Sequence, residues 1–241
     1  MPKSPSTERR RIAVYADGAN VAEMLAAYRA GRVQGFTTNP TLMQKSGVTD
    51  YSAFAREVLS VIRDLPMSFE VFADDFAEME RQARLIASWG ENVYVKIPVT
   101  DTAGRFSGEL VGRLAASGAK INVTAMLTAQ QVARVCQVLN PEVPAIVSVF
   151  AGRIADTGRD PVPVMREVVE IARALPRVQV LWASPREVLN VYQAEECGCH
   201  IVTVTKALLD KLPMRDKDLD ELSRETVEMF YCDAQRSGYR L

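Results

Sequence analysis

Histidine is almost absent from this 241-residue sequence, and its scarcity excludes several classes of enzyme. A hydrolase with a serine–histidine or cysteine–histidine pair would have to use the single histidine, His200, and no nucleophile motif surrounds that residue. Zinc sites built on several histidines are also excluded. The patterns G-x-x-x-x-G-K-S/T and strand-linked G-x-G-x-x-G are missing too, which disfavours the common kinds of nucleotide binding. We expect no metal and no organic cofactor.

Cysteine is scarce as well. Cys136, Cys197, Cys199 and Cys232 are too few to form a disulfide framework in a chain of this length. The pair in "CGC" (197–199) could suggest metal ligands, but the sequence has no second matching cluster. We interpret the four residues as buried thiols of a protein in the reducing cytoplasm.

Neither an excess of charge nor a long apolar run is present. The 29 basic and 30 acidic residues give a formal net charge of −1, so nothing indicates binding to nucleic acid or to an anionic membrane. No apolar run reaches the roughly 18 residues of a membrane span, and no apolar segment follows Met1. The basic run "ERRR" (8–11) ends a polar start, and we predict a disordered tail over residues 1–11.

What the sequence does contain is a regular alternation of short β-rich runs with longer segments of helical period. The predicted strands cover 11–17, 34–39, 68–73, 93–99, 119–125, 144–150, 178–184 and 200–205. The predicted helices cover 20–31, 50–65, 75–90, about 107–117, 129–140, 161–175 and 185–197, and further helix runs through 206–236 with a break near Pro213. We predict that Asp50 caps the second helix and that Gly90 ends the third.

Eight strand–helix units in a chain of this length favour an α/β fold, a closed (β/α)8 barrel. The alternative is an open, doubly wound sheet. The composition shows no break that would mark a linker, so we expect one domain over 12–241, with C-terminal helices from about residue 206.

Polar residues recur where the predicted strands end, which is the edge of a barrel that carries active sites. They are Asp17, Asn39, Glu70, Lys96, Asn122, Thr124, Ser148 and Ser184. Some have local explanations: Asp17 could cap a turn before Gly18, Asn39 could shape the turn before Pro40, and Ser184 could cap the next helix. A polar residue at nearly every strand end nevertheless predicts one shared pocket.

The most informative residue is Lys96, which interrupts the apolar strand "NVYVKIPVT" (92–100). A buried ammonium is costly, so its charge must reach solvent along the stem, pair with a carboxylate such as Glu70, or be lost. A neutral lysine amine attacks a ketone and forms a Schiff base, which then draws electrons from a neighbouring C–C bond. That chemistry needs acid–base groups, and Asp17 and Glu70 are the candidates.

Several motifs together resemble the transaldolase family of class I aldolases, which have a (β/α)8 barrel. The resemblance covers about residues 12–205. It is carried by "FTTNPTL" (36–42), "VYVKIPVT" (93–100), "INVTAMLT" (121–128), "VSVFAGRI" (147–154) and "WASPREV" (182–188).

The resemblance implies a role for each matching residue. Lys96 matches the Schiff-base lysine and Asp17 the acid–base group of C–C cleavage, while Glu70 and Thr124 match the pair that handles the catalytic water. Residues that match those binding the sugar hydroxyls are Asn39, Asn122 and Ser148. Residues that match the phosphate clamp are Arg153, Ser184 and Arg186, a combination that suits a terminal phosphate.

The resemblance also bears on the branch of the family. Relatives that cleave fructose 6-phosphate typically carry Gln at the place of Glu70 and Tyr at that of Phe150, so this sequence follows the transferase pattern. It implies transfer of a dihydroxyacetone unit from a ketose phosphate to an aldose phosphate. The alternatives are an aldolase of the fructose-6-phosphate type and a transaldolase for a specialised sugar. The family also implies sugar-phosphate metabolism, such as the pentose phosphate pathway, and a homo-oligomer.

Overall fold

The computed structural model describes residues 12–240, so the predicted tail at 1–11 lies outside the described residues. The chain divides into two compact units, which meet between Leu209 and Asp210 and are described separately. Among the described residues, no helix has both the length and the apolar character to span a membrane.

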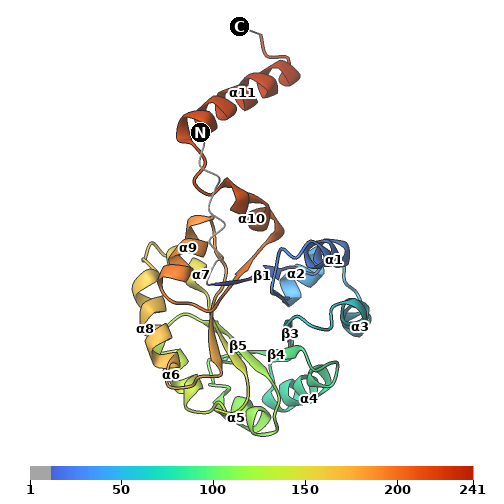
Figure 1. Ribbon diagram of the computed structural model, residues 1–241. Coiled ribbons are helices and arrows are strands. Elements are labelled where there is room, and N and C mark those ends of the chain that lie inside the picture. Colours follow the sequence, from blue (N-terminus) through green and yellow to red (C-terminus); the bar gives the residue numbers. More distant parts are fainter. Residues whose placement is uncertain (1–11, 241) are drawn as a thin grey trace. The chain divides into compact units, whose positions relative to one another are not determined.

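The first unit is a closed barrel of eight parallel strands in the order β1 to β8, which confirms the predicted (β/α)8 fold (Figure 1). The strands are β1 (Ala13–Asp17), β2 (Gly35–Thr37), β3 (Met67–Glu70), β4 (Val93–Pro98), β5 (Ile121–Met126), β6 (Ala145–Val149), β7 (Val178–Trp182) and β8 (Ile201–Val204). The helices are α1 (Val21–Arg29), α2 (Pro40–Lys45), α3 (Tyr51–Val61), α4 (Phe76–Ala87), α5 (Gly108–Ala116), α6 (Ala129–Cys136), α7 (Ala151–Ala155), α8 (Val162–Ala172), α9 (Leu189–Glu196) and α10 (Lys206–Lys211).

Local sequence signals set several of the helix ends. Asp50 caps α3 as predicted, since its carboxylate accepts a hydrogen bond from the amide of Ala53 at 2.9 Å. The prediction for Gly90 is wrong. Helix α4 ends at Ala87 with Ser88 as its C-cap, and Gly90 does not adopt the left-handed conformation that a glycine stop uses.

Two short helices and one late start were not predicted. Helix α2 follows β2 directly and α7 follows β6, each in what the sequence presents as a loop. The chain leaves β7 through Ser184, which has a φ of 63°, and α9 begins only at Leu189 and not at residue 185 as predicted. The short helices belong to the rim of the barrel where the polar residues gather.

An apolar cluster fills the barrel beneath that rim. It consists of Tyr15, Tyr94, Ile146, Leu181, Ala183 and Ile201, with Ala13 and Phe150 packed against it. Strand β6 is buried along its whole length, as expected for a parallel strand covered on both faces. The cluster closes the interior, so polar side chains at the strand ends face a pocket with an apolar floor.

The second unit, residues 210–240, contains a short 3-10 helix (Leu212–Met214) and α11 (Leu219–Ser237). The break between them agrees with the break predicted near Pro213. Asp218 caps α11 by accepting from the amide of Glu221 at 2.9 Å. None of the residues of α11 is buried, and several large apolar ones, such as Val227, Phe230 and Tyr231, are exposed. Cys232 of this helix is exposed too, so the prediction of buried thiols is wrong for Cys232, whereas Cys197 and Cys199 are buried.

Gly35 supplies a test of the barrel packing. Gly35 pairs with Tyr15 across β1 and β2, and a Cβ at Gly35 would lie 2.5 Å from the ring carbon Cζ of that buried tyrosine. We expect Gly35→Ala to lower the free energy of unfolding by about 1–3 kcal/mol, measured by urea denaturation. Gly112→Ala in α5 is the control, because its Cβ would make only ordinary contacts and should leave stability unchanged or slightly higher. Equal stability of the two variants would contradict this packing.

Candidate active site

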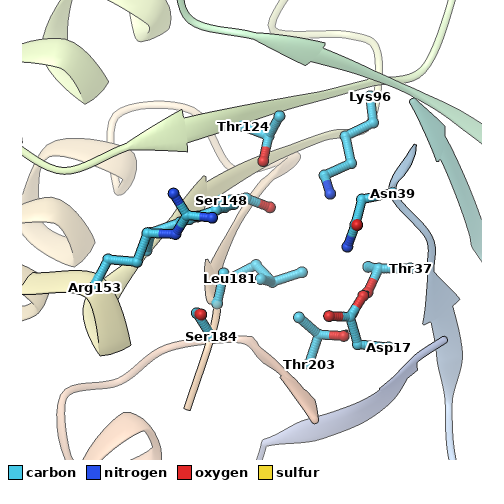
Figure 2. Close-up of a pocket in the computed structure, with 12 residues that line it drawn as sticks. Asp17, Thr37, Asn39, Lys96, Thr124, Ser148, Arg153, Leu181, Ser184 and Thr203 are labelled. Atoms are coloured by element: carbon cyan, nitrogen blue, oxygen red, sulfur yellow. Dashed lines mark hydrogen bonds between the residues drawn. The ribbon is translucent and has the colours of Figure 1, made fainter. Parts of the chain in front are cut away.

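A pocket opens at the carboxyl ends of the strands, with an empty volume of about 440 Å³ (Figure 2). It is lined by Asp17, Thr37, Asn39, Lys96, Thr124, Ser148, Phe150, Arg153, Leu181, Ala183, Ser184 and Thr203. Eight of the eleven residues that the sequence singled out are in this lining. Of the other three, Glu70 and Asn122 contact lining residues from behind, and Arg186 contacts Ser184 at the rim.

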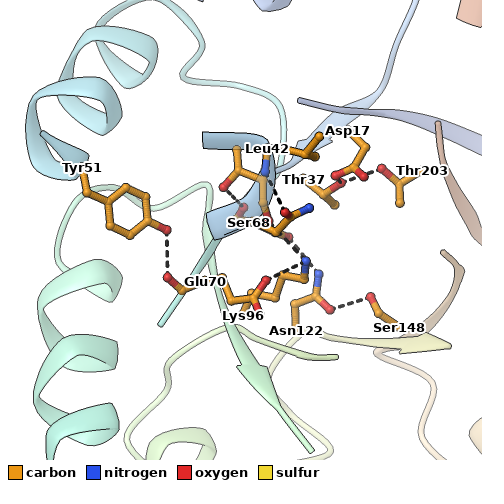
Figure 3. A network of polar contacts seen from close by, with 12 residues as sticks. Asp17, Thr37, Leu42, Tyr51, Ser68, Glu70, Lys96, Asn122, Ser148 and Thr203 are labelled. Atoms are coloured by element: carbon orange, nitrogen blue, oxygen red, sulfur yellow. Dashed lines mark hydrogen bonds and ion pairs between the residues drawn. The ribbon is translucent and has the colours of Figure 1, made fainter. Parts of the chain in front are cut away.

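Lys96 lies in the middle of β4 and points into the pocket, with only 7% of its side chain exposed. Its Nζ lies 2.9 Å from the Glu70 carboxylate and donates to the carbonyl of Thr38 at 3.2 Å (Figure 3). The burial shows that the interpretation in which the charge reaches solvent along the stem is wrong. The ion pair with Glu70, which the sequence left open, is present.

Strand register brings these groups together. Glu70 on β3 pairs with Lys96 on β4, and Lys96 pairs with Asn122 on β5, so the three residues are level in neighbouring strands. Tyr51 of α3 donates its hydroxyl to the backbone carbonyl of Glu70 at 2.9 Å, and its ring packs edge-on against Trp89. The end of β3 is therefore anchored from outside the barrel.

Asn122 is fully buried, and both ends of its amide are hydrogen-bonded to serines. Its Nδ2 donates to Ser68 at 3.0 Å, and its Oδ1 accepts from Ser148 at 2.7 Å. Ser148 lines the pocket, whereas Asn122 does not. Asn122 therefore fixes the orientation of the Ser148 hydroxyl, which faces the pocket from β6.

Thr124 lies at a bulge in β5 and points its side chain into the pocket. Ala125 has a φ of 61°, which is rare for a residue with a side chain, and the register with β6 shifts between Val123 and Met126. The Thr124 hydroxyl lines the pocket and is buried, with no hydrogen-bond partner among residues 12–240. Buried hydroxyls are normally paired, so an unpaired one in a pocket is a group ready to hold a ligand or water.

Asp17 ends β1, and its carboxyl is enclosed by the barrel. It accepts from Thr37 at 2.7 Å, and the amide of Gly18 donates to the backbone carbonyl of Thr37 at 3.1 Å, so the hydrogen bonds do not support a cap by Asp17 on the turn at Gly18. Burial raises the pKa of the Asp17 carboxyl, while the charge of Lys96 and the hydrogen bond from Thr37 act in the opposite direction and are smaller. A raised pKa makes this carboxyl a better proton acceptor than an ordinary aspartate, which suits a group that takes up a proton and later returns it.

Cationic groups stand at the rim opposite Asp17. Arg153 of α7 lines the pocket and lies over the ring of Phe150, with its guanidinium carbon 5.1 Å from the ring centre. Arg186 forms an ion pair with Asp156 and donates to the hydroxyl of Ser184 at 3.2 Å. Pairing with Arg186 holds the pKa of the Asp156 carboxyl below its ordinary value.

Two local explanations from the sequence have different outcomes. Ser184 does not cap the next helix, since α9 begins at Leu189 after Val188. Asn39 does have a local role, because its side chain accepts from the amide of Leu42 at 3.0 Å and so caps α2. It lines the pocket as well, so the two roles coexist.

Sequence reasoning missed the threonines beside Asp17. Thr37 and Thr203 both line the pocket, and their hydroxyl oxygens lie 2.6 Å apart. A signal for Thr203 existed, since it is the one polar residue in the apolar strand "IVTV". The roles of Ser68 and Tyr51 depend on contacts between distant segments, and no spacing in the sequence indicates them.

Fold and site together define a class: a (β/α)8-barrel protein with a buried lysine paired with one carboxylate, a second carboxylate in the same pocket and a cationic rim. Residues 14–241 match the family model described as transaldolase/fructose-6-phosphate aldolase. Within residues 12–240, no group of three or more His, Cys, Asp or Glu side chains is arranged to hold a metal ion.

Proteins named "Probable transaldolase" are similar over most of the chain. That of Dehalococcoides mccartyi is 33% identical over 210 residues, which is 86% of this chain and 94% of the relative. That of Roseiflexus castenholzii is 36% identical over 199 residues (82% and 88%), and that of Thermoanaerobacter sp. (strain X514) is 31% identical over 228 residues (94% and 99%). The chain belongs to the transaldolase/fructose-6-phosphate aldolase family and is an enzyme.

The Lys96–Glu70 pair can be tested by its effect on stability. Lys96→Met leaves the Glu70 carboxylate without its partner, and we expect a loss of about 2 kcal/mol in the free energy of unfolding. The double variant Lys96→Met, Glu70→Gln should recover part of this loss, giving a coupling energy of about 1–2 kcal/mol in urea denaturation. The exposed pair Arg81–Glu78 is the control and should show a much smaller coupling. Equal coupling in the two pairs would mean that burial does not strengthen the Lys96–Glu70 interaction.

Proposed function

We propose that the protein is a transaldolase that moves a dihydroxyacetone unit from a ketose phosphate to an aldose phosphate through a Schiff base on Lys96. The observation that carries the proposal is the placement of the Lys96 Nζ in the pocket, 2.9 Å from the Glu70 carboxylate, with Asp17 in the same pocket. The two carboxylates have different surroundings, as a division of acid–base work requires.

Glu70 and Thr124 serve the formation of the Schiff base. Glu70 accepts the proton that the Lys96 ammonium must lose before the amine attacks the C2 carbonyl of the ketose. The resulting carbinolamine then loses its C2 hydroxyl as water to give the iminium. Glu70 supplies the proton for that step, and the buried Thr124 hydroxyl, which has no partner in the described chain, holds the departing water.

Asp17 serves the C–C bond. As a carboxylate it takes the proton of the C4 hydroxyl, the C3–C4 bond breaks, and the bonding electrons pass to the iminium to form an enamine. The aldose phosphate leaves as an aldehyde. A second aldehyde then accepts the enamine carbon, and Asp17 returns its proton to the new alkoxide. The raised pKa of Asp17 suits a group that must hold the proton between these steps.

The remaining residues bind the sugar phosphate. Asn39 and Ser148 offer polar atoms to the donor hydroxyls from opposite walls, and Asn122 fixes the Ser148 hydroxyl. Arg153, Ser184 and Arg186 form the phosphate end, where guanidinium groups suit a dianion.

Phe150 favours transfer over simple cleavage. It lines the pocket and carries no proton to give the enamine, so the three-carbon fragment waits for an aldehyde acceptor. A fructose-6-phosphate aldolase activity is the second candidate, because the family includes both. A transaldolase for a specialised sugar, with the same chemistry, is the other alternative. A cytoplasmic location and a role in sugar-phosphate metabolism such as the pentose phosphate pathway follow from this proposal. A homo-oligomer would cover the exposed apolar side chains of α11.

Borohydride trapping tests the Schiff base. Incubation with fructose 6-phosphate and sodium borohydride should leave a reduced three-carbon adduct on Lys96, identified by peptide mass spectrometry, because borohydride reduces the iminium. Lys96→Met should give no adduct and no transfer to erythrose 4-phosphate, whereas Lys45→Met, at an exposed lysine outside the pocket, should behave like the wild type. Full activity of Lys96→Met would overturn the mechanism.

Phe150→Tyr tests the preference for transfer. A tyrosine hydroxyl at this wall of the pocket could protonate the enamine, so free dihydroxyacetone should form without an acceptor. We expect the ratio of cleavage to transfer to rise by about tenfold or more, measured by coupled assays with and without erythrose 4-phosphate. Phe150→Leu keeps an apolar side chain without a hydroxyl and is the matched control. A similar ratio in the two variants would show that another group supplies the proton.

A further inference from the structure

Three oxygen-bearing side chains form a chain along one wall of the pocket. Asp17 ends β1, Thr37 ends the adjacent β2, and Thr203 lies on β8, the other neighbour of β1. The Thr37 hydroxyl lies 2.7 Å from Asp17 Oδ1 and 2.6 Å from the Thr203 hydroxyl (Figures 2 and 3). Thr37 and Thr203 are 2% and 5% exposed, so water does not easily substitute for either contact.

Counting protons gives this chain a direction. A threonine hydroxyl has one proton and can donate one hydrogen bond. Thr37 uses its one proton in the hydrogen bond to the Asp17 carboxylate. The hydrogen bond between the two threonines therefore requires Thr203 to be the donor. A hydroxyl that accepts one hydrogen bond becomes a stronger donor in the next, because the bonds polarise one another.

From this geometry we propose that Thr203 is a positioning residue for Asp17: it donates to Thr37 and thereby holds the Thr37 hydroxyl as a donor to the Asp17 carboxylate. The inference rests on the proposed function, in which the Asp17 carboxylate is the base of C–C cleavage. Thr203 does not touch the Asp17 carboxylate itself and acts on it through the Thr37 hydroxyl. It stabilises the ionised form and fixes the oxygen that Thr37 occupies, which leaves the other carboxylate oxygen for the sugar hydroxyl.

Other charged groups surround Asp17, and none replaces this chain. Lys96 from β4 and Arg153 from α7 line the same pocket, and Glu70 from β3 lies behind Lys96. Glu23 of α1 and Lys206 of α10 line a small neighbouring hollow that Asp17 borders on its outer side. Among residues 12–240, Lys96, Arg153, Glu70 and Glu23 make no hydrogen bond to the Asp17 carboxylate, whereas Thr37 does.

The test is the pH profile of kcat/KM for Thr203→Val and Thr203→Ser. Valine keeps the shape of threonine without its hydroxyl, and serine restores the hydroxyl. The acidic limb of this profile reports groups of the free enzyme that must be ionised, Asp17 among them. In Thr203→Val the carboxylate is less stabilised, so the limb should move to higher pH by about 0.5–1, and kcat/KM below the limb should fall about threefold to tenfold.

The outcomes separate positioning from packing. Thr203→Ser should bring the acidic limb back to its wild-type position. A Thr203→Val enzyme with a lower plateau but an unmoved limb would overturn the proposal, because lost packing lowers activity at all pH values. A limb that moves to lower pH would also overturn it, since Thr203 would then be an acceptor from Thr37.

Borohydride trapping distinguishes a failure of the Thr203 proposal from a failure of the proposed function. Thr203→Val should still form a reduced adduct on Lys96, because Schiff-base formation uses Glu70 and Thr124, and a slower C3–C4 cleavage would change only the share of six-carbon and three-carbon adducts. No adduct in the wild-type enzyme would refute the proposed function itself. A wild-type adduct, together with an unmoved acidic limb in Thr203→Val, would refute only the role of Thr203.

Discussion

A positive charge inside a parallel barrel is tolerated only beside a negative one, and the Lys96–Glu70 pair meets that condition. Both side chains are largely removed from solvent, so each needs the other. Their pairing depends on the register of β3 with β4, and the Tyr51 hydroxyl holds the backbone of Glu70 from outside. A buried lysine inside an enclosed, partly apolar pocket is what Schiff-base chemistry needs, because such a pocket limits competing water.

The two carboxylates of the site differ in what surrounds them. Glu70 faces an ammonium at 2.9 Å, whereas Asp17 accepts from a neutral hydroxyl at 2.7 Å and has a raised pKa because of burial. This contrast fits one group that stays close to the amine and another that carries a proton to and from a sugar oxygen. The apolar cluster in the barrel interior lowers the local dielectric constant on that side of the site.

The sequence was sufficient for the fold and for much of the site, for physical reasons. Buried parallel strands can be recognised in a sequence as apolar runs, and a charged residue in such a run, as at Lys96, has few explanations. Contacts between distant segments leave no such trace. The Asn122 amide that orients Ser148, the bulge at Ala125 and the threonine pair beside Asp17 arise from register and strand closure. Helix ends were also less predictable: the sequence indicated that the third predicted helix ends at Gly90, whereas α4 ends at Ala87, because a glycine also occurs in turns that do not end a helix.

In the proposed function, the ion pair between Arg186 and Asp156 makes phosphate binding an exchange of one anion for another. Arg186 already holds a carboxylate through its Nε, at 2.9 Å, and through its Nη2. In the proposed function, an arriving phosphate replaces Asp156 on this guanidinium, so only the difference between the two anions contributes to binding. Because the pair is about half exposed, the exchange costs little, and Asp156 can recapture the arginine as the product leaves. In that function, each of the two sugar phosphates that use the site in one catalytic cycle would be held firmly enough to react and loosely enough to depart.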